Sequence, residues 1–251
     1  MIVKLVLAYD GTAFRGWARQ PRVRTVEGTL EGALARILGS RPALSVAGRT
    51  DAGVHARAQV ASFDAPNGLD PSRLQRGVNG MLAPEVVVLS AARVAAGFDA
   101  RHRAAAREYR YRIDLGPVPD PFTARYVWHR PGELSLTAMR RAARDLVGGH
   151  DFASFGRPSE RGGPTVRRLE RLSVARTGER LEITARANAF LQQMTRSLVG
   201  TVVDVGEGRI DAGSMPEVLA ARDRSRAGRV APPHGLTLER VLYRGTHGSV
   251  L

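Results

Sequence analysis

The sequence predicts an α+β fold made of two tandem βαββαβ halves, and three observations support this prediction. The chain has 251 residues, of which 43% are hydrophobic, so it can fill a sizeable core. Short apolar runs rich in β-branched residues alternate with segments of helical periodicity. The same order of elements can be followed in both halves, which is the split βαβ, or ferredoxin-like, topology used twice.

The first half has the order strand, helix, strand, strand, helix, strand. A helix is predicted after the capping residue Thr25, with an apolar face that starts at Val26 and an end at Gly39. A second helix is predicted from about Pro71, a favourable first-turn residue, to Gly77. Apolar runs predict the strands, at residues 2–8, 43–47, 59–63 and 85–89.

The second half repeats this order with one insertion. Helices are predicted at residues 134–147 and 189–205, and a further helix near 214–222 is inserted before the last strand. Strands are predicted at residues 108–115, 169–175, 180–187 and 238–243, the middle two forming a hairpin. We expect the join near residues 103–107, and therefore two packed domains with a cleft where their sheets meet, at 1–104 and 105–251.

The charge balance predicts a polyanionic partner. The chain carries 38 Lys and Arg against 24 Asp and Glu, a formal net charge of +14 at pH 7. Such an excess attracts phosphate through counterion release, so nucleic acid is the expected partner. Lys4 is the only lysine, so a composition bias is the alternative explanation, although a bias only exchanges Lys for Arg. A membrane surface is a poorer match, because no long helix has one Arg face and one bulky apolar face.

Composition also excludes several classes of protein. Cysteine is absent, which excludes disulfides, thiolate zinc sites, iron–sulfur clusters and cysteine nucleophiles. No apolar run approaches the length of about 18 residues that a membrane span needs. The first residues have the pattern of a strand and not of a charged leader before an apolar stretch, so we expect a cytoplasmic protein.

The segment richest in chemical groups is residues 48–55, Gly-Arg-Thr-Asp-Ala-Gly-Val-His. One interpretation is a turn in which Thr50 and Asp51 bind the backbone and Gly53 takes a positive φ angle. The other is a single carboxylate presented from a loop. A carboxylate beside Arg49 stays ionised, which suits a nucleophile or a base and not a general acid. A paired carboxylate is missing from the segment, so two-carboxylate glycosidase chemistry is not favoured.

Motifs for metals and cofactors are not found, and we expect neither. The chain has no Gly-rich stretch followed by Lys-Ser or Lys-Thr for a nucleotide phosphate. Its six histidines lack zinc-type spacing. The Gly-Glu-Gly at residues 206–208 lacks the third glycine of a dinucleotide fingerprint and is typical of a helix end.

Aromatic or basic residues that could contact RNA or a carboxylate stand out at three places. Tyr109 and Tyr111 share one face of a predicted strand, where they either belong to the core or stack on an extruded base. Arg196 lies among apolar residues of a predicted helix; if buried it needs an anionic partner, for which Asp51 is the candidate. The basic, Gly- and Pro-rich segment 156–164 is either an RNA-contacting loop or an ordinary surface loop.

The chain resembles a known family through several motifs in order. Besides the octet 48–55 they are Tyr9-Asp10-Gly11-Thr12, Gly16-Trp17, Gln20, Phe98-Asp99-Ala100-Arg101, Tyr109-Arg110-Tyr111, Asp151-Phe152-Ala153-Ser154-Phe155, Ala187-Asn188-Ala189-Phe190, Met194-Thr195-Arg196 and Ala231-Pro232-Pro233-His234-Gly235-Leu236. With these motifs the chain resembles the tRNA pseudouridine synthase A family over nearly its whole length. The octet is highly specific.

The resemblance implies an enzyme that isomerises uridine to pseudouridine at positions 38, 39 and 40 of the tRNA anticodon stem-loop, without a cofactor and as a homodimer. It implies one extended mixed or antiparallel sheet made by both halves, with helices on one side and the active site in a central cleft. Asp51 falls on the essential aspartate, a nucleophile or base, and Arg49 lies in the same motif. Tyr109 falls on the tyrosine that stacks on the target base, and Arg196 on the residue that pairs with the aspartate. The residues implied to contact tRNA are Tyr109, Phe98, Arg101, His102, Arg157, Arg161 and Arg167.

The chain departs from the family pattern at a few positions. Asp99 stands where a His is usual, and the other departures are Ala18, Gln192, Gln193 and Ser197. These positions put peripheral RNA contacts in question and leave the aspartate, the tyrosine and the pairing arginine untouched. Two rival functions stay open: a non-catalytic RNA-binding module, since ferredoxin-like sheets also resemble RNA-recognition domains, and a hydrolase acting on nucleosides or nucleotides.

Overall fold

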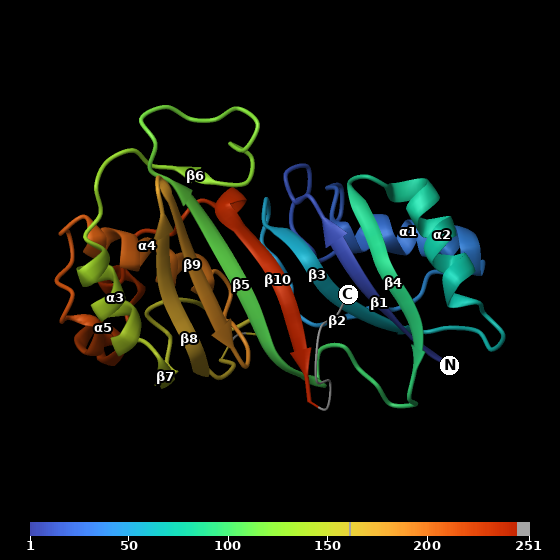
Figure 1. The fold of residues 1–251 in the computed structure, drawn as a ribbon. Helices are drawn as coiled ribbons and strands as arrows, with labels where there is room; N and C mark the ends of the chain where they lie inside the picture. The colour runs from blue at the N-terminus through green and yellow to red at the C-terminus, as the bar shows by residue number, and fades with distance from the viewer. Residues whose placement is uncertain (161, 245–251) are drawn as a thin grey trace. The chain divides into compact units, whose positions relative to one another are not determined.

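The chain forms two compact units (Figure 1). The computed structural model describes residues 1–160 and 162–244. The first unit comprises Met1–Arg107 and the strand from Thr237, and the second comprises Glu108–Leu236. Both contain helices and mostly antiparallel strands, so the predicted α+β class is confirmed. Within the described residues, no helix has the length and apolar character needed to cross a membrane.

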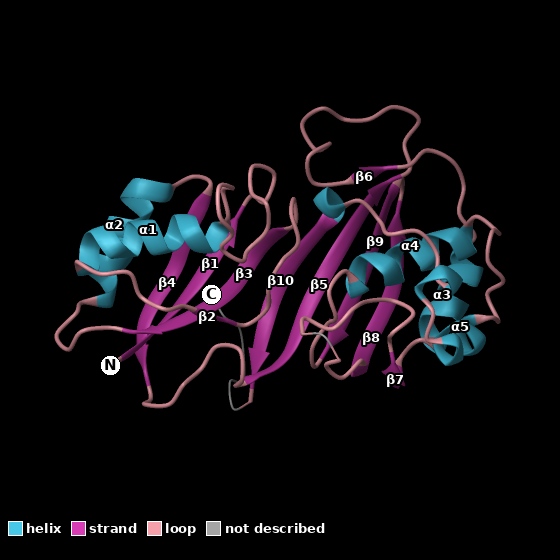
Figure 2. Ribbon diagram, turned by 180° about the vertical axis from the view of Figure 1, so that it is seen from behind, coloured by secondary structure: helices cyan, strands magenta, loops and turns pink. Residues whose placement is uncertain are grey.

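The first unit has a mostly antiparallel sheet and two helices. Its elements are β1 (Ile2–Tyr9), α1 (Val26–Leu38), β2 (Ser45–Val46), β3 (His55–Asp64), α2 (Pro71–Leu82), β4 (Val86–Val94) and, from the end of the chain, β10 (Leu236–Tyr243). The strand order is β4-β1-β3-β10, with β2 paired to β3. β1 is antiparallel to both β3 and β4, whereas β10 is parallel to β3. The helices pack on each other and α2 packs on β4; Figure 2 shows both over that strand.

Local sequence signals explain the two helices of this unit. The side chain of Thr25 accepts a hydrogen bond from Gly28 N, and Gly39 ends α1 with a left-handed φ of 77°, as predicted. The prediction for α2 is too short, because this helix continues past Gly77 to Leu82. A Cβ at Gly77 would lie 2.9 Å from the Ile37 side chain, so this glycine allows α1 to approach and does not end the helix.

The second unit has the strand order β5-β9-β8-β7, with β6 paired to β5. Its elements are β5 (Ala104–Asp114, in this unit from Glu108), β6 (Trp128–His129), α3 (Leu136–Asp145), β7 (Gly148–Asp151), β8 (Val166–Thr177), β9 (Arg180–Ala187), α4 (Met194–Gly206), α5 (Met215–Ala221) and two 3-10 turns, η1 (Arg224–Arg226) and η2 (Pro233–Gly235). β8 and β9 form the predicted antiparallel hairpin. α3 packs on β8 and on α4, so the helices cover one face of these strands (Figure 2).

The helix predicted at residues 189–205 begins only at Met194, which corrects the prediction. Leu191 is buried and extends the apolar periodicity, but the backbone before it is not helical. Gln192 exchanges two backbone hydrogen bonds with Arg157, and Gln193 takes a left-handed φ of 63°. The sequence pattern missed β6 and β7 because they are two and four residues long and have no alternating apolar run.

Candidate active site

Asp51 lies in the loop that joins β2 to β3 in the first unit. Its side chain is half-buried, and the neighbouring Arg49 is exposed. Gly53 has the positive φ angle, 77°, that the turn interpretation predicts, and Val54 N donates to Asp51 O at 3.1 Å. The loop is therefore a tight turn that presents one carboxylate, so the two interpretations of this segment are compatible.

Buried polar groups hold this loop on the side of Thr50. The Thr50 and Tyr9 hydroxyl oxygens are 2.8 Å apart and hydrogen-bonded. Gln59 Nε2 donates to Gly48 O at 2.7 Å and to the Tyr9 hydroxyl oxygen at 3.3 Å. Trp17 N donates to Thr50 O at 3.0 Å. The loop is thus fixed by side chains of two neighbouring strands, β1 and β3, and by the turn that follows β1.

His55 begins β3 and closes the other end of the loop. Its Nδ1 accepts a hydrogen bond of 3.0 Å from Gly11 N and lies 3.1 Å from Asp10 Oδ1. Asp10 Oδ1 also accepts from the backbone N and the hydroxyl of Thr12, at 2.9 and 2.6 Å. The turn at Asp10 and the loop that carries Asp51 are therefore packed together through the buried imidazole of His55.

Tyr109 and Tyr111 lie on β5 in the second unit and share a face, as predicted. Tyr109 is 6% exposed, and its ring meets the edge of Phe190 with centroids 5.2 Å apart and planes at 89°. Tyr111 is fully buried and donates from its hydroxyl to Pro232 O at 2.8 Å. Burial raises the pKa of Tyr111, and the nearby charge of Arg196 opposes that rise. Tyr111 is thus a core residue next to Arg196.

Arg196 occupies the first turn of α4, and it is the one residue of this helix that is not buried. Its Nε donates to Ala231 O at 2.7 Å, and Ala231 N donates back to Arg196 O at 3.1 Å. A Cβ at Gly200, one turn further on, would come within 1.9 Å of Arg229 O. The segment 228–231 therefore lies directly against α4 and fixes one side of the Arg196 guanidinium.

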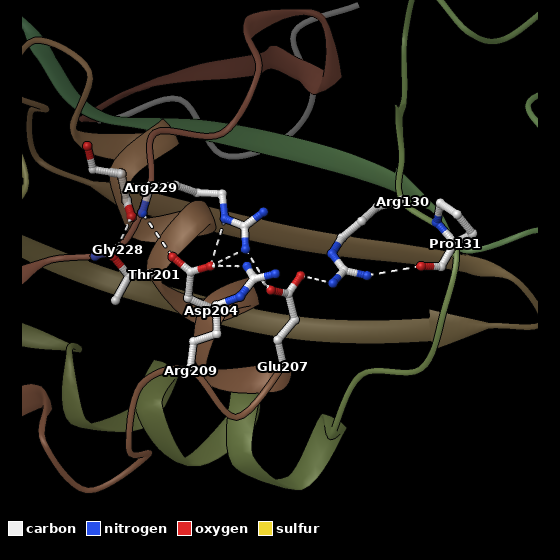
Figure 3. A network of polar contacts seen from close by, with 9 residues as sticks. Arg130, Pro131, Thr201, Asp204, Glu207, Arg209, Gly228 and Arg229 are labelled. Carbon is white, nitrogen blue, oxygen red and sulfur yellow. Dashed lines mark hydrogen bonds and ion pairs between the residues drawn. The ribbon is translucent and has the colours of Figure 1, made fainter.

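Two buried carboxylates at the end of α4 bind this segment (Figure 3). Arg229 donates from its backbone N to Asp204 Oδ2 at 2.9 Å and from Nε to Asp204 Oδ1 at 2.7 Å. Its Nη2 also donates to Glu207 Oε2 at 2.6 Å. Arg209 binds both carboxylates, and Arg130 binds Glu207. Arginines bind both carboxylates, and we therefore assign the network a structural role.

The residues 98–102, predicted to contact tRNA, form a turn before β5. Phe98 is half-buried against the Tyr243 ring, with centroids 5.3 Å apart. Arg101 and His102 are exposed, and their backbone N atoms donate to Asp99 Oδ1 at 2.8 and 2.7 Å. Burial acts to raise the pKa of Asp99, but hydrogen bonds from His102 N and other groups lower it overall. Asp99, which departs from the family pattern, therefore folds the turn that carries two exposed candidates for tRNA contact, Arg101 and His102.

The remaining tRNA-binding candidates differ in exposure. Arg157 is exposed, at the bridge to Gln192. Arg167 is half-buried and donates from Nη1 to Pro164 O and Val166 O at 2.9 and 2.7 Å. Burial lowers the pKa of Arg167. Arg161 lies outside the described residues.

Sequence reasoning missed the supporting groups Tyr9 and Gln59. From the sequence, Tyr9 was named only within the motif Tyr9-Asp10-Gly11-Thr12 and Gln59 only as the first residue of a predicted strand. The available signal was a polar side chain at the buried centre of an apolar strand, since Gln59 is 0% exposed on β3. No group of three or more His, Asp or Glu that could hold a metal ion occurs among the residues that the structure describes.

The chain is similar to a family model and to known proteins of other organisms. A family model described as tRNA pseudouridine synthase matches residues 142–244. The chain is 42% identical to "tRNA pseudouridine synthase A" of Myxococcus xanthus, over 96% of this chain and 92% of that protein. It is 44% identical to the protein of the same name from Methylobacterium nodulans, over 96% of this chain and 95% of that one. The chain therefore belongs to the tRNA pseudouridine synthase A family, isomerases that convert uridine in tRNA to pseudouridine.

Solved structures give a weaker match. The chain in "Crystal structure of the archaeal box H/ACA sRNP Nop10-Cbf5 complex" is 14% identical, with a TM-score of 0.38 over 80% of this chain and 43% of that one. A chain in "Crystal Structure of a Cbf5-Nop10-Gar1 Complex" is 15% identical, with a TM-score of 0.35 over 94% of this chain and 57% of that one.

Proposed function

We propose that this protein isomerises uridine to pseudouridine at positions 38, 39 and 40 of the tRNA anticodon stem-loop, with Asp51 as its nucleophile or base and without a cofactor. The proposal rests on the family relationship, which covers 96% of the chain at 42% identity, and on the octet around Asp51, through which the chain resembles that family. The buried anchors at Thr50 and Gly48 support the proposal, because they hold the loop that carries Asp51 in one conformation.

The proposed reaction conserves all atoms. The N-glycosidic bond between C1′ and N1 breaks, the uracil rotates in place, and a bond forms between C1′ and C5; the proton that leaves C5 is balanced by the one gained at N1. An ionised Asp51 can attack the sugar, attack the base, or remove the 2′ proton, and all three routes stay open. Each route needs the target nucleotide to leave the helical stack, at a cost of a few kcal/mol.

Tyr109 and Arg196 are proposed to serve the extruded base and the carboxylate. Stacking of the base on Tyr109 recovers about 1–3 kcal/mol of the extrusion cost. The edge contact with Phe190 supports this role, since it holds the ring in one orientation. Arg196 is proposed to pair with the catalytic aspartate, as the family resemblance implies. Its Nε is already bound to Ala231 O, which orients the guanidinium. Arg49 is proposed to assist from the same loop as Asp51.

The partner is proposed to be the tRNA anticodon stem-loop, in the cytoplasm where tRNA acts. The residues proposed to bind it are Tyr109, Phe98, Arg101, His102, Arg157, Arg161 and Arg167.

We also propose a homodimer. The loop between β5 and β6 supports self-association, since Phe122 is 90% and Val118 72% exposed in a chain that otherwise repels its copies by charge. The domain limits 1–104 and 105–251 stay a prediction.

The test is to incubate the protein with unmodified tRNA transcripts and to map pseudouridine by position. We expect modification at positions 38–40, and at least about a thousandfold slower reaction for Asp51→Asn with tRNA affinity retained. Asp64→Asn is the matched control, because Asp64 is exposed at the end of β3 and loses the same charge. Normal turnover by Asp51→Asn would refute the assignment of Asp51. Binding without any modification by the wild type would instead favour the RNA-binding module.

A further inference from the structure

The polar cluster behind the Asp51 loop has no assigned role in the reaction. It consists of Tyr9 at the end of β1, Thr50 in the loop and Gln59 in the middle of β3. All three side chains are buried, at 4%, 7% and 0% exposure. From this cluster we infer that Tyr9 is a positioning residue for Asp51 and that its hydrogen bond to Thr50 sets the place of the catalytic carboxylate. The inference rests on the proposed function of Asp51.

The Gln59 amide links the Tyr9 hydroxyl to the backbone around the loop. Gln59 Nε2 donates to the Tyr9 hydroxyl oxygen at 3.3 Å and to Gly48 O at 2.7 Å, while Gln59 Oε1 accepts from Val60 N at 3.1 Å. The amide of Gln59 is therefore fixed on both sides. The Tyr9 and Thr50 hydroxyl oxygens are 2.8 Å apart, and the hydrogen bond between them can run in either direction.

The backbone at Thr50 is held from the opposite side. Trp17 N donates to Thr50 O at 3.0 Å. Gly16, with a φ of 93°, lets this contact form: a Cβ there would come within 2.8 Å of Thr50 O and 3.2 Å of the Asp51 carbonyl carbon. Thr50 is thus clamped between Tyr9 and the turn at 16–17. The residue that follows it in the chain is Asp51, whose Cα position is fixed by this clamp.

Tyr9 acts through Thr50 and not on the substrate. Its ring is buried and lies 6.0 Å from the Trp17 ring, between centroids. Burial raises the pKa of Tyr9 to about 12, although the hydrogen bonds with Thr50 and Gln59 lower it. The hydroxyl is therefore protonated throughout the range in which the enzyme can be assayed. Because misplacement of a reacting group by about 1 Å costs up to about a hundredfold in rate, loss of this bond should affect the chemical step.

The experiment uses Tyr9→Phe and Thr50→Val, each of which removes one side of the hydrogen bond and keeps the shape. We expect each to lower the single-turnover rate on saturating tRNA by about ten- to a hundredfold, with the Kd for tRNA unchanged within about twofold. The double variant should be no slower than the slower single variant, because both remove the same bond. Thr50→Ser, which keeps the hydroxyl, should restore the rate to within about threefold of the wild type.

Ser154→Ala is the control for a general loss of stability. Ser154 is fully buried in the second unit, donates to Val218 O at 2.6 Å, and has no part in the proposed chemistry. A Tyr9→Phe rate within twofold of the wild type would overturn the inference, as would a rate loss no larger than that of Ser154→Ala at equal loss of stability. Additive effects of Tyr9→Phe and Thr50→Val would also overturn it. If the wild type itself forms no pseudouridine, the proposed function fails, and that outcome is distinct from all of these.

Discussion

At the scale of single residues, the absence of a side chain decides where backbones can meet. Gly200 is in the middle of α4, where alanine would ordinarily be the better helix former. A Cβ at this position would lie 1.9 Å from the carbonyl oxygen of Arg229. That oxygen belongs to backbone, which cannot move aside as a flexible side chain can. Gly200 is therefore needed for the contact that brings Ala231 to Arg196.

Substitution of Gly200 by alanine should lower stability, whereas the same change at Gly80 should raise it. Gly80 lies inside α2 and has no atom within 4 Å of a built Cβ, so Gly80→Ala should stabilise by about 0.5–1 kcal/mol. Gly200→Ala should destabilise by about 1–3 kcal/mol through overpacking. Urea unfolding measures both. Equal effects of the two changes would show that the segment after Gly228 yields easily and is not held by α4.

At the scale of elements, the segment 228–231 shows how an irregular stretch can be held as firmly as a helix. It has no regular secondary structure, yet its backbone binds the side chains of Thr201 and Asp204 and the backbone of Arg196. The Arg229 side chain adds ion pairs with two buried carboxylates, those of Asp204 and Glu207 (Figure 3). Asp204 lies in the last turn of α4 and Glu207 directly follows the helix, and both side chains bind Arg229. The contacts place Ala231 O against the Arg196 guanidinium.

Removal of the Arg229 side chain should therefore cost more than removal of Arg209, although both bind Asp204. The Arg229 side chain is 35% exposed and that of Arg209 is 55% exposed, while Asp204 is 8% exposed. Arg229→Met should lower the free energy of unfolding by about 2 kcal/mol, because it leaves buried carboxylates underpaired. Arg209→Met should cost less than about 1 kcal/mol, as expected for a more exposed pair. Chemical denaturation compares them; a larger loss for Arg209→Met would contradict this account of the network.

Elements with a strong local signal were predictable, and those set by distant contacts were not. Thr25 and Gly39 define α1 by capping alone, and both are confirmed. The start of α4 was misplaced because residues 189–193 carry helical periodicity but pair with Arg157, a contact that no local pattern reveals. Gly77 was mistaken for a helix end for the same reason, since its role is to admit Ile37 from α1.

At the scale of the whole molecule, the sequence predicts chemistry better than it predicts connectivity. The octet around Asp51 and the charge of +14 point to an RNA-modifying enzyme, and the family membership agrees. The last strand follows the second half in sequence, yet from Thr237 it belongs to the first unit and runs parallel to β3. The hydrophobic periodicity of a strand does not reveal which unit of the chain the strand joins. The support of Asp51 by Tyr9 is equally hard to predict from the sequence. It depends on a hydrogen bond between Tyr9 and Thr50, which are 41 positions apart in the chain.

The net charge of +14 predicts steep salt dependence of tRNA binding, and single arginines should contribute to it unequally. Arg157 is exposed, so Arg157→Gln should weaken binding and reduce the slope of log Kd against log salt by about 0.7–0.9, one phosphate contact. Arg167→Gln should reduce the slope less, because the Nη1 of Arg167 already donates to two backbone carbonyls.

Arg36→Gln, on the exposed face of α1, is the control for loss of one charge and should leave the slope unchanged. Titrations at several salt concentrations measure all three. A slope that falls equally in all three variants would mean that the molecule's overall field, and not a contact at Arg157, attracts the tRNA.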